Sequence, residues 1–256
     1  MALQEKLCVD DLVHGDSPLS ATGEKQVRFR LKTKKAAFER VHPQVVLSSP
    51  LKRAIRSALA AYPEHKIKID PKLRELDAVV GMHKEELQKF IQNAAPERKH
   101  KVDLSAVKDT KPWWSPAESQ EEAAKRMQKV LSEVQKNTLK GKKVALVAHM
   151  GVFRTMAGPL KPFPKEHWGS SRGFPRNFLP YYARIEATEA APAVLKVVPA
   201  TAEEATLVLV RHAHSRAQAA HTLRKKIEKF TPDPLKADTA KSLDNMIRKF
   251  NADRPV

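Results

Sequence analysis

The sequence predicts an α/β fold in which helices cover a mainly parallel β-sheet. Three short apolar runs, at residues 45–47, 144–148 and 206–210, are bounded by polar residues and are too short for helices of ordinary length. Runs of this kind are typical of strands that are buried on both faces of a parallel sheet. Longer amphipathic patterns lie elsewhere in the chain, so helices are expected to cover the sheet.

The other elements follow from local patterns. Helices are predicted at 19–39, 84–92 and 119–137. Either Ser115 or Ser119 offers a capping start for the third of these helices. Residues 181–185 and 194–198 are typical of a β-hairpin, and the polar residues 200–205 predict a surface linker that leads from this hairpin to the last strand.

Histidines end two of the predicted strands. Arg211 and His212 follow the last apolar run, and His149 follows the middle run. Ligand sites of open α/β sheets lie at the carboxyl ends of strands, so these side chains are expected to meet. The first run leads through a turn into a helix with Arg53 in its first turn, where the helix N-terminus and a planar guanidinium both favour phosphate.

Together, these segments resemble the histidine phosphatase superfamily, also called the phosphoglycerate mutase-like family. The resemblance covers most of residues 11–218 and implies a three-layer αβα sandwich with the phosphoglycerate mutase-like fold. Five segments carry it: Arg211-His212-Ala213, residues 16–26, Ser49-Pro50-Leu51-Lys52-Arg53-Ala54, Leu73-Arg74-Glu75-Leu76 with Gly81, and Val147-Ala148-His149.

The order of the segments departs from the family pattern. The Arg-His strand opens the domain in the family, whereas here it follows the other four segments. The cyclic order is preserved, as a circular permutation would leave it. Loss from a tandem ancestor is an alternative, since residues 233–237 faintly repeat residues 16–21. In a third arrangement, the Arg211-His212 strand reaches into another subunit of a homodimer.

The resemblance implies phosphoryl transfer through a phosphohistidine. Neutral imidazole is a good nucleophile near neutral pH, so His212 is expected to attack phosphorus. Glu75 is expected to protonate the leaving oxygen and then to activate water. No metal or cofactor is needed for this chemistry. Catalytic roles fall to His212, Glu75 and His149, and phosphate-binding roles to Arg211, Arg53, His149, Ser215 and Gln218.

Three positions near the Arg-His pair depart from the family pattern. Ala213 replaces a glycine, which is tolerable if its φ angle is negative. His214 replaces a frequent glutamate, and Gln218 stands where many members have asparagine. We expect these changes to alter the choice of substrate. Phosphatase activity is favoured over mutase activity because nothing in the sequence identifies a second phosphate site.

Composition supplies a competing hypothesis. The 256 residues include 47 Lys and Arg against 29 Asp and Glu, a net charge of +18. Such a surface suits RNA or another anionic macromolecule, so the alternative is an inactive phosphatase-like scaffold that binds RNA or a protein assembly. The cations are spread along the chain, and many are explained by solvated helix faces.

Residues 1–218 are predicted to form one domain and 219–256 a helical tail that packs on that domain or on a partner. The chain has one cysteine, Cys8, which favours a reducing compartment. It has no apolar stretch that could span a bilayer. We expect an intracellular, cytoplasmic location, with mitochondria as the alternative. Trp113 and Trp114 are interpreted as an anchor for a long loop in preference to a lid.

Overall fold

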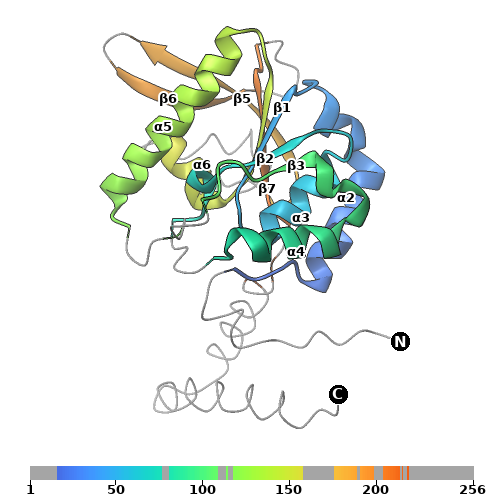
Figure 1. The fold of residues 1–256 in the computed structure, drawn as a ribbon. Helices are drawn as coiled ribbons and strands as arrows, with labels where there is room; N and C mark the ends of the chain where they lie inside the picture. Colours follow the sequence, from blue (N-terminus) through green and yellow to red (C-terminus); the bar gives the residue numbers. More distant parts are fainter. Residues whose placement is uncertain are drawn as a thin grey trace, which may run out of the picture.

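The computed structural model describes residues 16–76, 81–108, 114, 118–157, 176–188, 191–198, 204–213, 215 and 218. Five α-helices and two 3-10 helices accompany seven strands in this part of the chain (Figure 1). The helices are α2 (Ala21–Glu39), α3 (Lys52–Ala61), η1 (Pro71–Leu73), α4 (Lys84–Ala94), η2 (Pro96–Lys101), α5 (Gln120–Leu139) and α6 (Met150–Met156). The strands are β1 (Val45–Ser48), β2 (Ile67–Ile69), β3 (Val102–Asp103), β4 (Val144–Ala148), β5 (Pro180–Thr188), β6 (Ala191–Val198) and β7 (Leu207–Arg211).

The strands form one sheet in the order β3-β2-β1-β4-β7-β5-β6. The first five of these run parallel, and β5 pairs antiparallel with both β7 and β6. The prediction of an α/β fold with a mainly parallel sheet is therefore confirmed.

The last strand in the sequence lies inside the sheet. Strand β7 pairs along its whole length with β4, from Leu207 opposite Val144 to Arg211 opposite Ala148, and its other edge pairs with β5. The Arg211-His212 strand thus completes the sheet of its own chain, so no second subunit is needed to place it. Its late position in the sequence is compatible with a circular permutation, whose origin stays a prediction.

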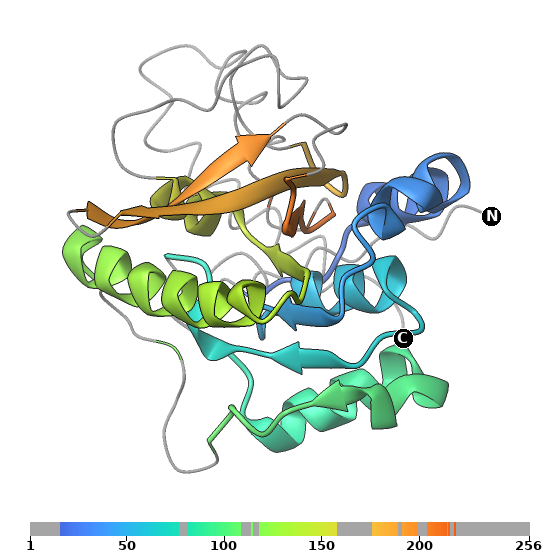
Figure 2. The same ribbon diagram turned by 90° about the horizontal axis from the view of Figure 1, so that it is seen from above.

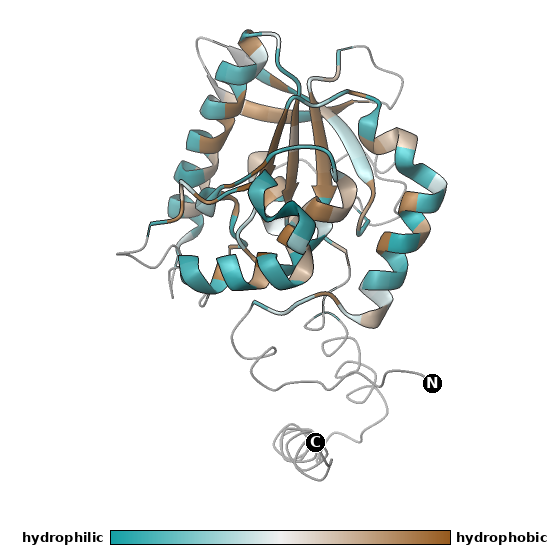
Figure 3. Ribbon diagram, turned by 45° about the vertical axis from the view of Figure 1, so that its right-hand side comes forward, coloured by the Kyte–Doolittle hydropathy of each residue, from teal (hydrophilic) through white to brown (hydrophobic). Residues whose placement is uncertain are grey.

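Helices cover both faces of the sheet and make three layers (Figure 2). Successive side chains of a strand point to opposite faces, and β4 shows this alternation. Its Ala145 and Val147 belong to the core beneath α2, α3 and α4. Its Val144, Leu146 and Ala148 belong to the core beneath α5 and α6. Apolar residues accordingly fill the central strands while polar residues face outward on the helices (Figure 3).

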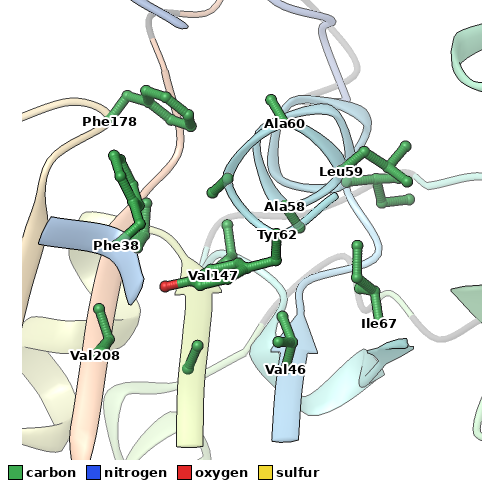
Figure 4. Packing of buried hydrophobic residues seen from close by; sticks show 14 of the residues in the cluster. Phe38, Val46, Ala58, Leu59, Ala60, Tyr62, Ile67, Val147, Phe178 and Val208 are labelled. Carbon is green, nitrogen blue, oxygen red and sulfur yellow. The ribbon is translucent and has the colours of Figure 1, made fainter. Parts of the chain in front are cut away.

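Aromatic packing fixes helix α3 over the sheet. Tyr62, at the end of α3, meets the Phe38 ring edge-on at 6.3 Å between centroids, and Phe38 packs on Phe178 at 5.2 Å. Phe38 and Phe178 lie to one side of α3, and Tyr62 and Val147 lie between α3 and the strands (Figure 4). The helix that carries Arg53 is therefore packed against the strand that leads into His149.

The longer predicted elements are confirmed, and the short ones escaped prediction. The three predicted helices correspond to α2, α4 and α5, and the predicted hairpin is β5 and β6. Ser119, one of two candidate caps, forms a capping box with Glu122 at the start of α5. Strands β2 and β3 were not predicted, because two or three residues are too few to show a period. Helix α6 was not predicted either, since its seven residues make only about two turns.

Several predicted features lie outside the described residues: the tail 219–256, Cys8, Trp113 and His214. Trp114 is described. It packs on the core beneath α4 and meets the His83 ring edge-on at 5.1 Å, as expected of an anchor. None of the helices in the described part of the chain is long and apolar enough to cross a membrane.

Candidate active site

The predicted site residues meet at one end of the sheet. Strands β1, β4 and β7 are parallel neighbours, so their carboxyl ends share an edge. His149 follows β4 and His212 follows β7, and the His212 backbone N–H donates to the carbonyl of Ala148 at 3.1 Å. The prediction that the two strand-end histidines come together is confirmed.

Two imidazoles and a carboxylate form the centre of the site. The ring centroids of His149 and His212 lie 5.0 Å apart. The Nδ1 atom of His149 lies 4.0 Å from an Oε atom of Glu75. Both histidines are buried, whereas the Glu75 side chain is 23 % exposed. The carboxylate therefore has the access to solvent that proton exchange and entry of water require.

Burial favours the neutral form of the His149 ring. Burial lowers the pKa of His149 well below its ordinary value, and the charges of Arg53, His212 and Arg211 lower it further. Its Nε2 atom makes a 2.7 Å hydrogen bond with the Ser49 hydroxyl, whose oxygen also accepts from the backbone N–H of Leu51 at 3.3 Å. A protonated His149 would therefore need a nearby anion to offset this lowering of its pKa.

Arg53 and Arg211 supply the positive charge of the site. Arg53 occupies the first turn of α3, as predicted, and Arg211 is the last residue of β7. Burial lowers the pKa of both guanidinium groups, while the nearby carboxylate of Glu75 raises it. These partly desolvated cations will interact strongly with a phosphate, because fewer water dipoles screen the attraction.

Hydrogen bonding sets the tautomer of His212. Its Nδ1 atom lies 2.6 Å from the carbonyl oxygen of Ala213. A carbonyl oxygen only accepts hydrogen bonds, so Nδ1 carries the ring proton and donates it. In the neutral ring the lone pair is therefore on Nε2, the nitrogen that can act as a nucleophile.

Ser57 connects helix α3 to the end of β7. Its hydroxyl donates to the Arg53 carbonyl at 2.7 Å and accepts from the Ala213 backbone N–H at 3.0 Å. Ala213 is fully buried, and it is not among the non-glycine residues of positive φ in the described chain. The condition under which alanine can replace the family's glycine is therefore met.

Ser215 and Gln218 are hydrogen-bonded to one another and lie close to His212 in the sequence. The Ser215 N–H donates to the Gln218 side-chain oxygen at 3.0 Å, and the Gln218 N–H donates to the Ser215 hydroxyl at 3.3 Å. Asn177 joins them, because its side-chain amide donates to Gln218 at 3.2 Å and to the His212 carbonyl at 2.9 Å. Their predicted contact with phosphate stays a prediction.

Gly151 gives the Glu75 carboxylate its space. A Cβ atom at position 151 would lie 2.4 Å from Glu75 Oε1 and 3.0 Å from Leu76 Cγ. The same Oε1 atom accepts a hydrogen bond from the Leu76 backbone N–H at 3.1 Å. Glycine at the start of α6 thus lets the carboxylate pass close to the backbone.

Sequence reasoning missed three polar residues of the site: Ser49, Ser57 and Asn177. Ser49 lies in the segment that carried the family resemblance, which was the one available signal for it. Ser57 and Asn177 are polar residues among many, and their partners are 156 and 35 positions away in the sequence. Only the fold brings these partners together.

Comparison with protein families now completes the assignment. Residues 12–175 match the model of the histidine phosphatase superfamily, branch 1. The chain belongs to this superfamily. The match ends before β7, so it does not include Arg211 and His212, which the sheet places beside the end of β4. The comparison with curated protein sequences found no significant match.

Solved structures of phosphatases are similar to the chain. Ecdysone phosphate phosphatase from Bombix mori, crystallised with tungstate, is 21 % identical, with a TM-score of 0.41, 56 % coverage of this chain and 55 % of that enzyme. The chain therefore spans about half the length of this relative. Mycobacterial glucosyl-3-phosphoglycerate phosphatase is 17 % identical, with a TM-score of 0.40 and coverages of 79 % and 91 %. A structure described as mycobacterial hydrolase 1 is 20 % identical, with a TM-score of 0.40 and coverages of 72 % and 86 %.

Proposed function

We propose that the chain is a phosphomonoesterase that forms a phosphohistidine on His212. The observation that carries this proposal is the hydrogen bond from His212 Nδ1 to the Ala213 carbonyl, because it leaves the lone pair of the neutral ring on Nε2. The buried cations Arg53 and Arg211 lie close enough to shift the pKa of the neighbouring His149. A nucleophile, two cations and a carboxylate are the groups that phosphoryl transfer requires.

In the first step, His212 Nε2 attacks phosphorus and forms the N–P bond as the ester P–O bond breaks. Glu75 donates its proton to the leaving oxygen, so the alcohol departs neutral. Arg53 and Arg211 stabilise the charge that gathers on the equatorial phosphoryl oxygens. His149 contributes as a hydrogen-bond donor. Once the dianion offsets its desolvation, it takes a proton from solvent, which it returns to solvent when phosphate leaves.

In the second step, water attacks the phosphohistidine. The Glu75 carboxylate takes a proton from this water as the new O–P bond forms and the N–P bond breaks. Inorganic phosphate leaves, and both His212 and Glu75 return to their starting protonation states. Ser215 and Gln218 are proposed to offer polar contacts to the phosphate.

Hydrolysis of 4-nitrophenyl phosphate tests this function. The purified chain is expected to hydrolyse it between acidic and neutral pH, and vanadate is expected to inhibit as a mimic of pentacoordinate phosphorus. His212→Ala should abolish turnover, while His100→Ala, at an exposed position, should leave it unchanged. Activity that survives in His212→Ala, or turnover without an acid-labile phosphoryl group on His212, would refute the mechanism.

One surface feature favours the second candidate, a scaffold that binds an anionic macromolecule such as RNA. Helix α2 exposes five cations that make no ion pair among the described residues, and Phe29 beside them is 59 % exposed. The guanidinium of Arg30 lies 5.7 Å from the Phe29 ring centroid. Exposed cations with an aromatic ring are suited to single-stranded nucleic acid. The cations are Lys25, Arg28, Lys32, Lys34 and Lys35.

RNA binding through α2 is tested by the salt dependence of binding to a single-stranded RNA. Lys32→Glu with Lys35→Glu should weaken binding and flatten its dependence on salt concentration. Lys125→Glu with Lys129→Glu, at exposed positions of α5, makes the same change in net charge on a different face. Equal weakening by both pairs would show that only net charge matters and would exclude a site on α2.

A further inference from the structure

A buried ionic cluster lies behind the loop that carries Glu75. Arg126, on α5, forms a two-pronged ion pair with Glu118, in which Nε donates to Oε1 at 2.7 Å and Nη2 donates to Oε2. Arg74 donates to the same carboxylate at 2.9 Å. The side chains of Arg126 and Glu118 are only 8 % and 6 % exposed. We call Arg74, Glu118 and Arg126 the arginine cluster.

Arg126 also binds two backbone carbonyl groups of the segment that leads to Glu75. Nη1 of Arg126 donates to the carbonyl oxygen of Lys72 at 2.5 Å and to that of Arg74 at 3.1 Å. The second carbonyl belongs to the peptide unit that joins Arg74 to Glu75. One guanidinium thus uses three nitrogens, two on a carboxylate and one on the loop, and its plane is fixed by both contacts.

Charge in the cluster is arranged around Glu118. Burial lowers the pKa of Arg74, the charge of Arg126 lowers it further, and the carboxylate of Glu118 raises it. Two buried guanidinium groups would repel one another without this carboxylate. Glu118 therefore allows Arg126 to approach the loop while Arg74 is beside it.

We propose that Arg126 is a positioning residue for Glu75: it fixes the Arg74-Glu75 peptide so that the carboxylate stays near the His149 and His212 rings. Arg126 touches neither substrate nor reacting atoms, and it acts through Glu75. The proposal rests on the proposed function, since the position of Glu75 matters for turnover only if Glu75 transfers protons. Helix α5 thereby contributes to a site whose other residues come from strand ends and α3.

The test compares two esters in Arg126→Lys, which keeps the charge and loses the planar fork. A displaced proton donor slows the hydrolysis of an ester with a poor leaving group more than that of an ester whose leaving group departs without a proton. General acid–base groups contribute about 10²–10⁴-fold, so kcat/KM for phenyl phosphate should fall at least about 10-fold more than for 4-nitrophenyl phosphate. Vanadate inhibition should be unchanged, because Arg53, Arg211 and His212 are untouched.

Two controls separate positioning from general damage. Val134→Ala creates a cavity at a buried position two turns further along α5, away from the loop. It should lower kcat/KM for both esters by the same factor. In a double-mutant cycle with Glu75→Gln, Arg126→Lys should add no further loss, because a residue that acts through Glu75 has no effect without it. Equal losses on both esters, or additive losses in the cycle, would overturn the proposal.

Hydrogen exchange provides a readout that does not depend on activity. Arg126→Lys should speed exchange of the backbone N–H groups of Arg74 and Leu76 more than Val134→Ala does. Unchanged exchange there overturns the proposal even if the enzyme is active. If the wild-type chain hydrolyses neither ester, the proposed function is refuted. Faster exchange in Arg126→Lys would still show that Arg126 stabilises the backbone around Glu75.

Discussion

The hydroxyl of Ser57 accepts a hydrogen bond from the backbone N–H of Ala213, and this bond joins helix α3, which carries Arg53, to the end of strand β7, which leads into His212. This bond is 3.0 Å long and is buried. The same hydroxyl donates to the Arg53 carbonyl at 2.7 Å. One side chain therefore links Arg53, the proposed phosphate ligand, to the segment that carries His212, the proposed nucleophile.

Ser57→Ala is expected to lower the free energy of unfolding by about 1–3 kcal/mol, because the buried Ala213 N–H loses its acceptor. Urea unfolding measures this change. Ser132→Ala is the matched control, since Ser132 also donates to a carbonyl four residues earlier but is exposed. A loss of similar size in the control would show that helix propensity, and not the contact with Ala213, explains the result.

Gly151→Ala is expected to lower kcat while vanadate inhibition is kept. The new methyl group would lie 2.4 Å from Glu75 Oε1, so the carboxylate must move. Displacement of an acid–base group should lower kcat by up to about 10²–10⁴-fold. Gly141→Ala is the comparison, because Gly141 has a φ of 75° with nothing within 4 Å of its added Cβ.

Gly141→Ala should cost about 1 kcal/mol of stability and leave kcat unchanged, because alanine is strained at this positive φ. Wild-type kcat in Gly151→Ala would show that Glu75 has room to retreat without losing its function.

Stability is expected to fall as the pH falls below about 6.5. Burial lowers the pKa of His149 in the folded chain, so between the folded and unfolded pKa values the unfolded state binds the extra proton. Unfolding is then favoured by up to about 1.4 kcal/mol per pH unit. Thermal or urea unfolding across this range measures the slope.

His149→Gln removes this titration and keeps a polar group near Ser49, so its stability should depend less on pH in the same range. A slope equal to that of the wild-type chain would mean that other groups cause the pH dependence. Saturating vanadate should also reduce the wild-type slope, because the bound anion favours protonated His149.

Arg53→Lys is expected to weaken vanadate inhibition by about 10–100-fold, the equivalent of one or two charged hydrogen bonds. Lysine keeps the charge but lacks the planar fork. Arg56→Lys serves as the control on the same helix, because Arg56 is half-buried and pairs with Glu24 away from the site. Equal effects of the two substitutions would point to a general disturbance of α3.

Local patterns predicted much of the fold and the centre of the site. The apolar runs, the Ser119 cap and the strand-end histidines are properties of neighbouring residues, so they were visible in the sequence. Contacts between distant residues were not: Arg126 and the Lys72 carbonyl are 54 positions apart. The lowered pKa of His149 was not visible in the sequence either, since burial causes it and depends on the whole fold.

The central place of β7 has a consequence for biosynthesis. In the described sheet, β7 lies between β4 and β5 and pairs with one edge of each. It is also the last of the seven strands to be made. At roughly 5–20 residues per second, a ribosome needs several seconds to extend the chain from the end of β4 to β7. During that interval the nascent chain presents open, apolar strand edges, which are sites for chaperone binding or aggregation. His212, the proposed nucleophile, is therefore made together with the strand that closes the sheet, so a nascent chain that ends before β7 has neither a complete sheet nor His212.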